Sequence, residues 1–197
     1  SEGDDKVVLI LGEEEWPFPI PVVRDNDAWI FDAEAGRDEI LARRIGRNEL
    51  SAIQAVLAYV DAQNEYAETA RTNGGIATYA QRIVSQPGKK DGLYWPAELG
   101  GKSPLGDLVA QAAAKGYDVD EKRAPFHGYF YKVLTRQGAS APGGAYDYIA
   151  DDKMIGGFAL VAYPAEYENS GIMTFLVNHD GIVFQKDLDS RTSEIVE

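Results

Sequence analysis

The chain has 197 residues, of which 45% are hydrophobic and 26% are charged, a composition typical of a globular protein with one substantial core or two small ones. The 32 acidic residues against 19 Lys and Arg give a formal charge of -13, which disfavours nucleic acid and anionic membrane surfaces as partners. The absence of cysteine excludes disulfides, thiol catalysis and thiolate metal sites.

The first 32 residues predict a small β-sheet. Apolar runs at 6–11 and Ala28–Phe31 are typical strands, with a turn at Asp25-Asn26-Asp27 before the second run. The alternating prolines of Trp16–Pro21 favour an extended edge or a polyproline segment. A sheet this small is marginal in water alone, so we expect a second copy or the following helix to cover its apolar face.

A long helix is predicted from about Ala33 to Arg71, with Asp32 as its N-cap. Apolar residues spaced three and four apart predict the face that packs on the core; they are Leu50, Ile53, Leu57 and Val60, with Val56 widening the stripe. Basic residues gather on the first part of this helix, at Arg37, Arg43, Arg44 and Arg47. We expect them to pair with the protein's own acids or to pack over the adjoining sheet.

The rest of the chain predicts a second helix and an antiparallel meander. Ser103-Pro104 is a typical helix start, with an end at Gly116. Four strands are expected at 126–135, 155–163, 172–177 and 182–185, with the last two joined by a turn at Asn178–Gly181. The predicted fold is α+β: a long N-terminal helix packed on a four-stranded antiparallel meander, preceded by a small β-sheet remnant. The expected domains are 1–32 and 33–197.

No pattern of catalytic or metal-binding residues emerges, and no cofactor is predicted. Neither His127 nor His179 has a partner at a metal-ligand spacing such as H-E-x-x-H, and no G-x-S-x-G motif occurs. His127 is interpreted as a structural residue at a strand start, with a functional role as the alternative. Acidic and amide side chains near the end of the chain offer oxygens to calcium, although surface solubility also explains them; they are Asp147, Asp151, Asp152, Asn178 and Asp180.

Aromatic residues near prolines and glycines are the main candidates for binding. Most of them should lie in the core, because strand alternation directs half of them inward. The alternative is an aromatic patch for a partner or a sugar ring, with the loop from Tyr94 to Pro104 at its rim. The candidate binding residues are Trp16, Phe18, Tyr94, Trp95, His127 and Tyr129.

Several long strings of residues resemble a known family. They are Trp16–Pro21, Arg47–Leu50, Gly92–Pro96, His127–Phe130 and Gly157–Pro164. Together they resemble a bacterial family of exported proteins known only as a domain of unknown function, numbered twenty-nine fifty. The resemblance covers nearly the whole chain and implies a precursor with a signal peptide, which Ser1–Asp5 do not contain. It therefore implies a periplasmic or secreted protein.

A second resemblance concerns architecture. From Ala33 to Asp187, the order of long helix, glycine-rich loop and meander is similar to the soluble head of a type IV pilin or pseudopilin. The helix lacks the purely apolar first half and the processing site of that family. Residues Val7 to Phe31 resemble the closing strands of a cystatin-like or nuclear-transport-factor-like cone.

These observations lead to two functional hypotheses. The first is a non-enzymatic binding or assembly module of the bacterial cell envelope, with a protein partner or self-association and no membrane span in this chain. The alternative is a small-ligand-binding protein or an enzyme, with a pocket between the N-terminal sheet and the C-terminal domain. Whether the protein has enzymatic activity stays open at this point.

Overall fold

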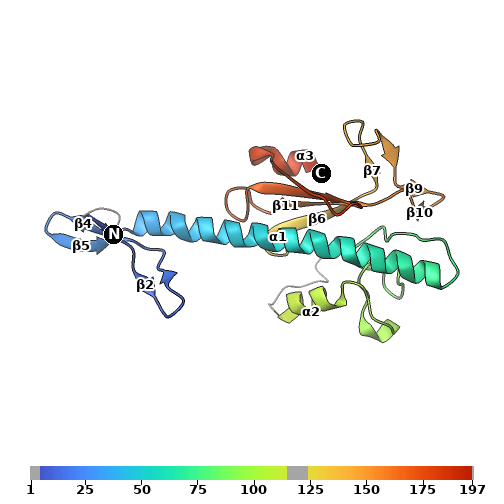
Figure 1. Ribbon diagram of the computed structural model, residues 1–197, viewed down its shortest axis with the longest axis horizontal. Helices are drawn as coiled ribbons and strands as arrows, with labels where there is room; N and C mark the ends of the chain where they lie inside the picture. The colour runs from blue at the N-terminus through green and yellow to red at the C-terminus, as the bar shows by residue number, and fades with distance from the viewer. Residues whose placement is uncertain (1–4, 115–123, 197) are drawn as a thin grey trace. The chain divides into compact units, whose positions relative to one another are not determined.

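The computed structural model describes residues 5–114 and 124–196. It is an α+β protein, as predicted, and it divides into two compact units, Ser1–Arg47 and Asn48–Glu197. Helix α1 (Ala33–Thr72) contributes its first part to the N-terminal unit and the rest to the C-terminal unit (Figure 1).

The N-terminal unit contains five short strands. Three of them form an antiparallel sheet in the order β1-β4-β5, and the other two, β2 and β3, form a separate pair. The strands are β1 (Lys6–Val7), β2 (Ile10–Leu11), β3 (Trp16–Pro17), β4 (Val22–Asp25) and β5 (Ala28–Phe31). A two-residue turn joins β4 to β5, and its first residue, Asn26, has a φ of 54°. The predicted turn is confirmed, since asparagine tolerates this left-handed conformation.

Helix α1 begins as the sequence predicts. The Asp32 carboxylate accepts a hydrogen bond from the Ala35 N–H at 3.0 Å, and the Asp32 carbonyl accepts one from the Gly36 N–H at 2.9 Å. The first bond satisfies a donor that the first helical turn otherwise leaves unpaired, and the second is the first intrahelical bond. The helix then continues for 40 residues, through Gly46, to Thr72.

A four-stranded antiparallel sheet forms the main layer of the C-terminal unit. Its order is β13-β12-β11-β6, so neighbouring strands follow one another in the chain, as predicted for a meander. The strands are β6 (Tyr129–Leu134), β11 (Ala159–Pro164), β12 (Met173–Asn178) and β13 (Val183–Asp187). The turn between β12 and β13 lies at Asn178–Gly181, where Gly181 has a φ of 74° and donates its N–H to the Asn178 carbonyl at 3.0 Å.

Smaller elements complete this unit. They are α2 (Gly106–Ala114), α3 (Thr192–Val196), the 3-10 turns η1 (Ala97–Leu99) and η2 (Asp189–Arg191), and the short strands β7 (Arg136–Gln137), β8 (Tyr146–Asp147), β9 (Ile149–Ala150) and β10 (Lys153–Met154). Helix α2 begins at Gly106 rather than at Pro104, because the Gly106 N–H closes a turn on the Ser103 carbonyl first. Its predicted end at Gly116 lies outside the described residues.

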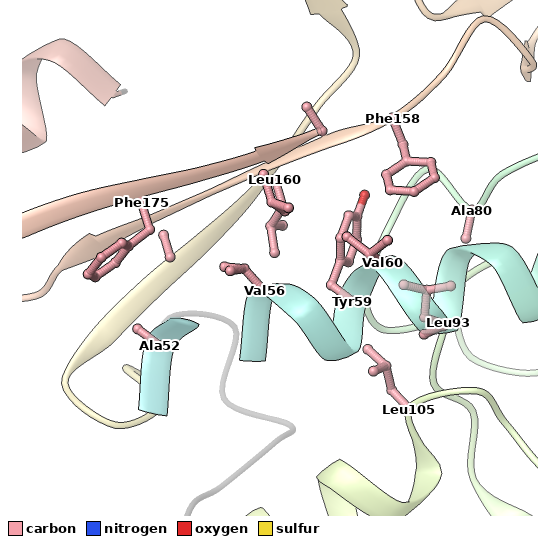
Figure 2. Packing of buried hydrophobic residues seen from close by; sticks show 14 of the residues in the cluster. Ala52, Val56, Tyr59, Val60, Ala80, Leu93, Leu105, Phe158, Leu160 and Phe175 are labelled. Carbon is pink, nitrogen blue, oxygen red and sulfur yellow. The ribbon is translucent and has the colours of Figure 1, made fainter. Parts of the chain in front are cut away.

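The buried face of α1 matches the predicted one only in part: Val60 is buried and Ile53 packs partly against the core, as expected, but the leucines do not. Val56, Tyr59 and Val60 point into the core with several alanines, whereas Leu50 is 65% exposed and Leu57 is 41% exposed. Figure 2 shows Val56 and Tyr59 directed toward Leu160 and Phe158. The centre of the buried face is rotated by about 100° of helix, one residue, from the centre of the predicted stripe, and Val56 and Val60 lie on the border that the two share. Small residues such as Ala52 and Ala62 form much of it, which lets the helix approach the sheet closely.

A glutamine completes this core. The side chain of Gln63 is fully buried, and its amide accepts a hydrogen bond from the Ala80 N–H and donates one to the Ala80 carbonyl, each at 2.8 Å. It also donates to the Tyr59 hydroxyl at 2.8 Å. These bonds hold the segment around Ala80 against the helix, although that segment forms no regular element. Both the oxygen and the nitrogen of the Gln63 side-chain amide have hydrogen-bond partners.

Candidate binding surface

The N-terminal unit has almost no buried core. Among residues 5–47, only Pro21 and Gly36 are buried. A Cβ atom on Gly36 would lie 2.8 Å from Cγ1 of Ile20, so the absence of a side chain there lets Ile20 rest directly on α1. This contact fixes the segment before β4 on the helix and leaves most apolar side chains of the strands uncovered.

Four aromatic residues of this unit, three of them in ring contact, make up what we call the aromatic row: Trp16, Phe18, Trp29 and Phe31. The Phe18 ring meets the rings of Trp16 and Phe31 edge to face, at centroid distances of 6.3 Å and 6.2 Å. Trp29 lies two residues before Phe31 on β5 and therefore on the same face of the strand. The exposed fractions of Trp16, Trp29 and Phe31 are 48%, 49% and 58%.

Arg43 of α1 holds one end of the aromatic row. Its guanidinium carbon lies 5.3 Å from the centre of the Trp16 ring, and its Nη1 donates to the Pro17 carbonyl at 2.7 Å. Glu39, one turn earlier, accepts a hydrogen bond from Nε at 2.7 Å. The predicted roles of this arginine, pairing with an acid and packing over the sheet, are both confirmed. The indole is thus fixed while half its surface stays open to solvent.

Strand β5 is largely uncovered along its whole length. All four of its residues are exposed, and the contact between the Phe31 and Phe18 rings covers only part of one face. In the described part of the chain it pairs with β4 alone and forms one edge of the sheet. Exposed apolar side chains on an unpaired edge are features that soluble proteins usually avoid unless another chain binds there.

The other candidate residues lie in the C-terminal unit, where each has different surroundings. Tyr94 is partly buried against the core. Trp95 is half-buried; its Nε1 donates to the Gly100 carbonyl at 3.3 Å, and Lys90 Nζ lies 5.6 Å from its ring centre. The loop therefore satisfies the polar groups of this tryptophan internally.

Tyr129 and His127 lie where the start of β6 meets α1. Tyr129 is fully buried and its hydroxyl donates to the Met173 carbonyl at 2.9 Å, so its ring is not available to a partner in this structure. His127 has a φ of 51° and its ring contacts Phe126 at 4.3 Å. The Glu49 carboxylate of α1 accepts hydrogen bonds from the N–H groups of Ile172 and Met173, each at 3.0 Å. These contacts join α1, β6 and the start of β12.

A polar cleft is present in the C-terminal unit, and neither His127 nor Trp95 lines it. Its volume is about 240 Å³, and it lies between the end of α1, the following loop and the β9–β10 hairpin, with Tyr66, Arg82, Asp91 and Lys153 in its wall. Arg82 Nε lies 3.8 Å from Asp91 Oδ2. Burial and the negative charge of Asp91 raise the pKa of the Tyr66 hydroxyl. Sites for small ligands usually enclose about 300–1,000 Å³ and are mostly apolar, unlike this cleft.

The acidic residues considered as calcium ligands have local partners or turn conformations. Asp151 and Asp152 adopt positive φ values of 48° and 59° in a turn, and Asp180 accepts a hydrogen bond from the Asn178 amide at 2.9 Å. Across residues 5–114 and 124–196, no group of three His, Asp or Glu side chains is arranged to hold a metal ion. No helix in this part of the chain combines the length and the apolar character needed to cross a bilayer.

The comparison with family models is decisive for membership. The model described as "Protein of unknown function (DUF2950)" matches residues 1–197. The chain belongs to this family. The predicted membership is therefore confirmed over the full sequence. No curated protein and no solved structure matches the chain.

The strings that carried the family resemblance have structural roles in this DUF2950 chain. Trp16–Pro21 supplies two rings of the aromatic row and the contact of Ile20 with α1. The Asn48 side chain donates a hydrogen bond to the Ser170 carbonyl at 2.9 Å. A Cβ atom on Gly128 would lie only 2.7 Å from Nδ2 of this asparagine. Two of the strings thus meet at the junction of α1 and β6.

Sequence reasoning missed half of the aromatic row. Trp29 and Phe31 were expected in a strand, yet they were not among the candidate binding residues. The available signal was the run Ala28–Phe31, which has aromatic residues at alternate positions and no charge to protect an edge.

Proposed function

We propose that the protein is a non-enzymatic binding module of the bacterial cell envelope and that it holds a protein partner through the aromatic row. The observation that carries this proposal is the exposure of Trp16, Trp29 and Phe31 on a unit with almost no core of its own. Aromatic side chains are the residues that most often anchor protein interfaces, because they bury large areas at a small cost in conformational entropy.

The fixed positions of two side chains in the aromatic row support this role. Edge-to-face contacts and the Arg43 guanidinium hold Trp16 and Phe18 in place before a partner arrives. A surface that is already ordered loses less conformational freedom on binding, so more of its contact energy appears as affinity.

Export to the periplasm or beyond is part of the same proposal and rests on the family resemblance. A division into an N-terminal cone-like remnant, residues 1–32, and a pilin-head-like domain, residues 33–197, is likewise a proposal about ancestry. A pilin-like origin would suit a role in assembly, since pilin heads pack against neighbouring subunits.

The proposal is tested by photo-crosslinking in the cells that produce the protein. A photoreactive amino acid is placed at Trp29, and in a matched control at Phe184, an aromatic residue of β13 that is 49% exposed. We expect a discrete crosslinked species from position 29 in the periplasmic or extracellular fraction, and none from position 184. The absence of any species from position 29, or equal labelling from both positions, would contradict the proposal. The mass of the species tells a partner from a second copy of this 21.6 kDa chain.

A further inference from the structure

The open edge of β5 presents unpaired backbone groups at defined residues. The Asp32 N–H donates to the Pro21 carbonyl at 2.9 Å, so Pro21 and Asp32 form a hydrogen-bonded position of the β4–β5 ladder. Such positions alternate along an antiparallel pair, which makes Val23 and Ile30 the next bonded pair. The N–H and C=O groups of Trp29 and Phe31 therefore point away from β4.

The other side of β4 agrees with this assignment. The Arg24 N–H donates to the Asp5 carbonyl at 2.9 Å, on the side of β1. Its partner across the ladder, Trp29, thus has no backbone bond to Arg24. Within residues 5–114 and 124–196, no strand pairs with the outer edge of β5.

Resting on the proposed function, we propose that this edge binds its partner by strand addition: an extended segment of another protein pairs with β5 and extends the sheet. Backbone groups of Trp29 and Phe31 would bond to the added strand, as in other complexes that extend a sheet edge. Their side chains, on one face, would pack beside its apolar residues.

The charges around β5 indicate the chemistry of that partner strand. Residues 22–34 contain four acids, at Asp25, Asp27, Asp32 and Glu34, and one base, Arg24. Asp27 and Asp32 flank the strand directly, while β5 itself is uncharged. An apolar segment with Lys or Arg at both ends would complement this arrangement.

The same charges disfavour a second copy as the occupant. In an antiparallel pair of two β5 strands, the Asp27 end of one copy lies beside the Asp32 end of the other. In a parallel pair, each acid lies beside its own equivalent. Like charges meet at both ends in either orientation, which destabilises a strand pair.

The test uses the full chain and a labelled synthetic peptide with a central Val-Thr-Val-Thr-Val segment between two pairs of lysines. Binding is followed by fluorescence anisotropy. Trp29→Pro removes the outward N–H but not the bonds to β4, and the matched control Trp29→Val removes the same indole and keeps the N–H. We expect Trp29→Pro to bind the peptide at least about tenfold more weakly than Trp29→Val. A peptide with glutamates in place of the lysines should bind the unmodified chain about tenfold more weakly or worse.

Amide exchange measured by NMR on the unmodified chain gives a readout that does not depend on any variant folding. The Trp29 and Phe31 amides should exchange quickly in the free chain and become protected when the peptide binds, while the Ile30 amide, already bonded to β4, should change little. Equal peptide binding by Trp29→Pro and Trp29→Val, no binding by the unmodified chain, or protection of Ile30 alone would overturn strand addition. Protection of Trp29 by self-association, without peptide, would overturn the assigned partner.

The crosslinking experiment distinguishes a failure of strand addition from a failure of the proposed function. If crosslinking from position 29 succeeds while the peptide and exchange experiments fail, the aromatic row binds a partner through side chains alone. If crosslinking fails as well, both proposals are wrong.

Discussion

At the scale of single residues, Gln63 shows how one side chain can replace an element of secondary structure. Its amide exchanges both backbone hydrogen bonds with Ala80, which a neighbouring strand would otherwise do. Because the site is buried, losing the amide leaves two backbone groups without partners and without water.

Gln63→Leu should therefore lower the free energy of unfolding by about 1–3 kcal/mol, the cost of leaving buried polar groups unsatisfied. Urea denaturation followed by circular dichroism measures this loss. The matched control is Gln54→Leu, at an exposed position of the same helix, which should change stability by less than about 0.5 kcal/mol. Equal effects of the two substitutions would show that Gln63 has no special structural role.

Tyr129 gives the protein a defined sensitivity to alkaline pH. Burial, and secondarily the negative charge of Glu49, raise the pKa of its hydroxyl above the usual 10.0. The folded chain thus keeps a proton that the unfolded chain releases above that pH, so this contribution to stability is complete below pH 10.0 and is lost as pH rises toward the folded pKa.

We expect the urea midpoint to fall as the pH is raised past 10.0, and to fall less steeply in Tyr129→Phe, which cannot ionise at this position. The substitution also removes the hydrogen bond to Met173, so the comparison concerns the slope with pH rather than the stability at one pH. Identical slopes for the two proteins would contradict the account of this tyrosine.

At the scale of elements, the two parts of α1 differ in what they pack against. Up to Arg47 the helix belongs to the N-terminal unit, where Gly36 is its buried residue among those described. From Asn48 onward it belongs to the C-terminal unit and contributes Val56, Tyr59 and Val60 to the core. One regular helix therefore serves a nearly coreless unit and a well-packed one.

The rotated face of α1 can be tested with adjacent residues. Val56→Ala should lower the free energy of unfolding by about 2 kcal/mol, because it removes fully buried methyl groups. Leu57→Ala, at the next position, should cost less than about 1 kcal/mol, because that side chain is 41% exposed and alanine favours helix. Thermal or urea unfolding of both variants decides between the faces, and a larger loss for Leu57→Ala would restore the face predicted from the sequence.

Elements with local signals were predictable from the sequence. The cap at Asp32 and the turn at Asn178–Gly181 each depend on a few neighbouring residues, and both are confirmed. The buried face of α1 was predicted only in part: Val60 is buried, but leucines occur on the exposed side while alanines and Gln63 fill much of the packed side. A pattern of large apolar residues does not reveal a contact made by small ones.

The candidate site was predictable only in part, for a related reason. Trp16 and Phe18 were identified from their unusual proline-rich string. Trp29 and Phe31 belong to a short alternating run that most proteins would bury. Their exposure depends on the absence of a covering element in the described N-terminal unit, which no local pattern reports.

At the scale of the whole molecule, apolar exposure is distributed unevenly between the units. The described core cluster draws its buried residues from Ala52 onward, whereas residues 5–47 leave large apolar side chains on β2, β3 and β5 in contact with solvent. The formal charge of -13 keeps such a chain soluble and favours basic partners. A binding role for the N-terminal unit accounts for both features.

The three tryptophans allow the most direct test of this account. Hydroxyl-radical footprinting with mass spectrometry compares the oxidation of Trp16, Trp29 and Trp95 in the purified chain and in cells that produce it. Trp95, a partly buried residue of the C-terminal unit, is the internal control. The account predicts that Trp16 and Trp29 are oxidised readily in the purified chain and protected in cells, while Trp95 reacts equally in both. Equal oxidation of Trp16 and Trp29 in the two samples would contradict it.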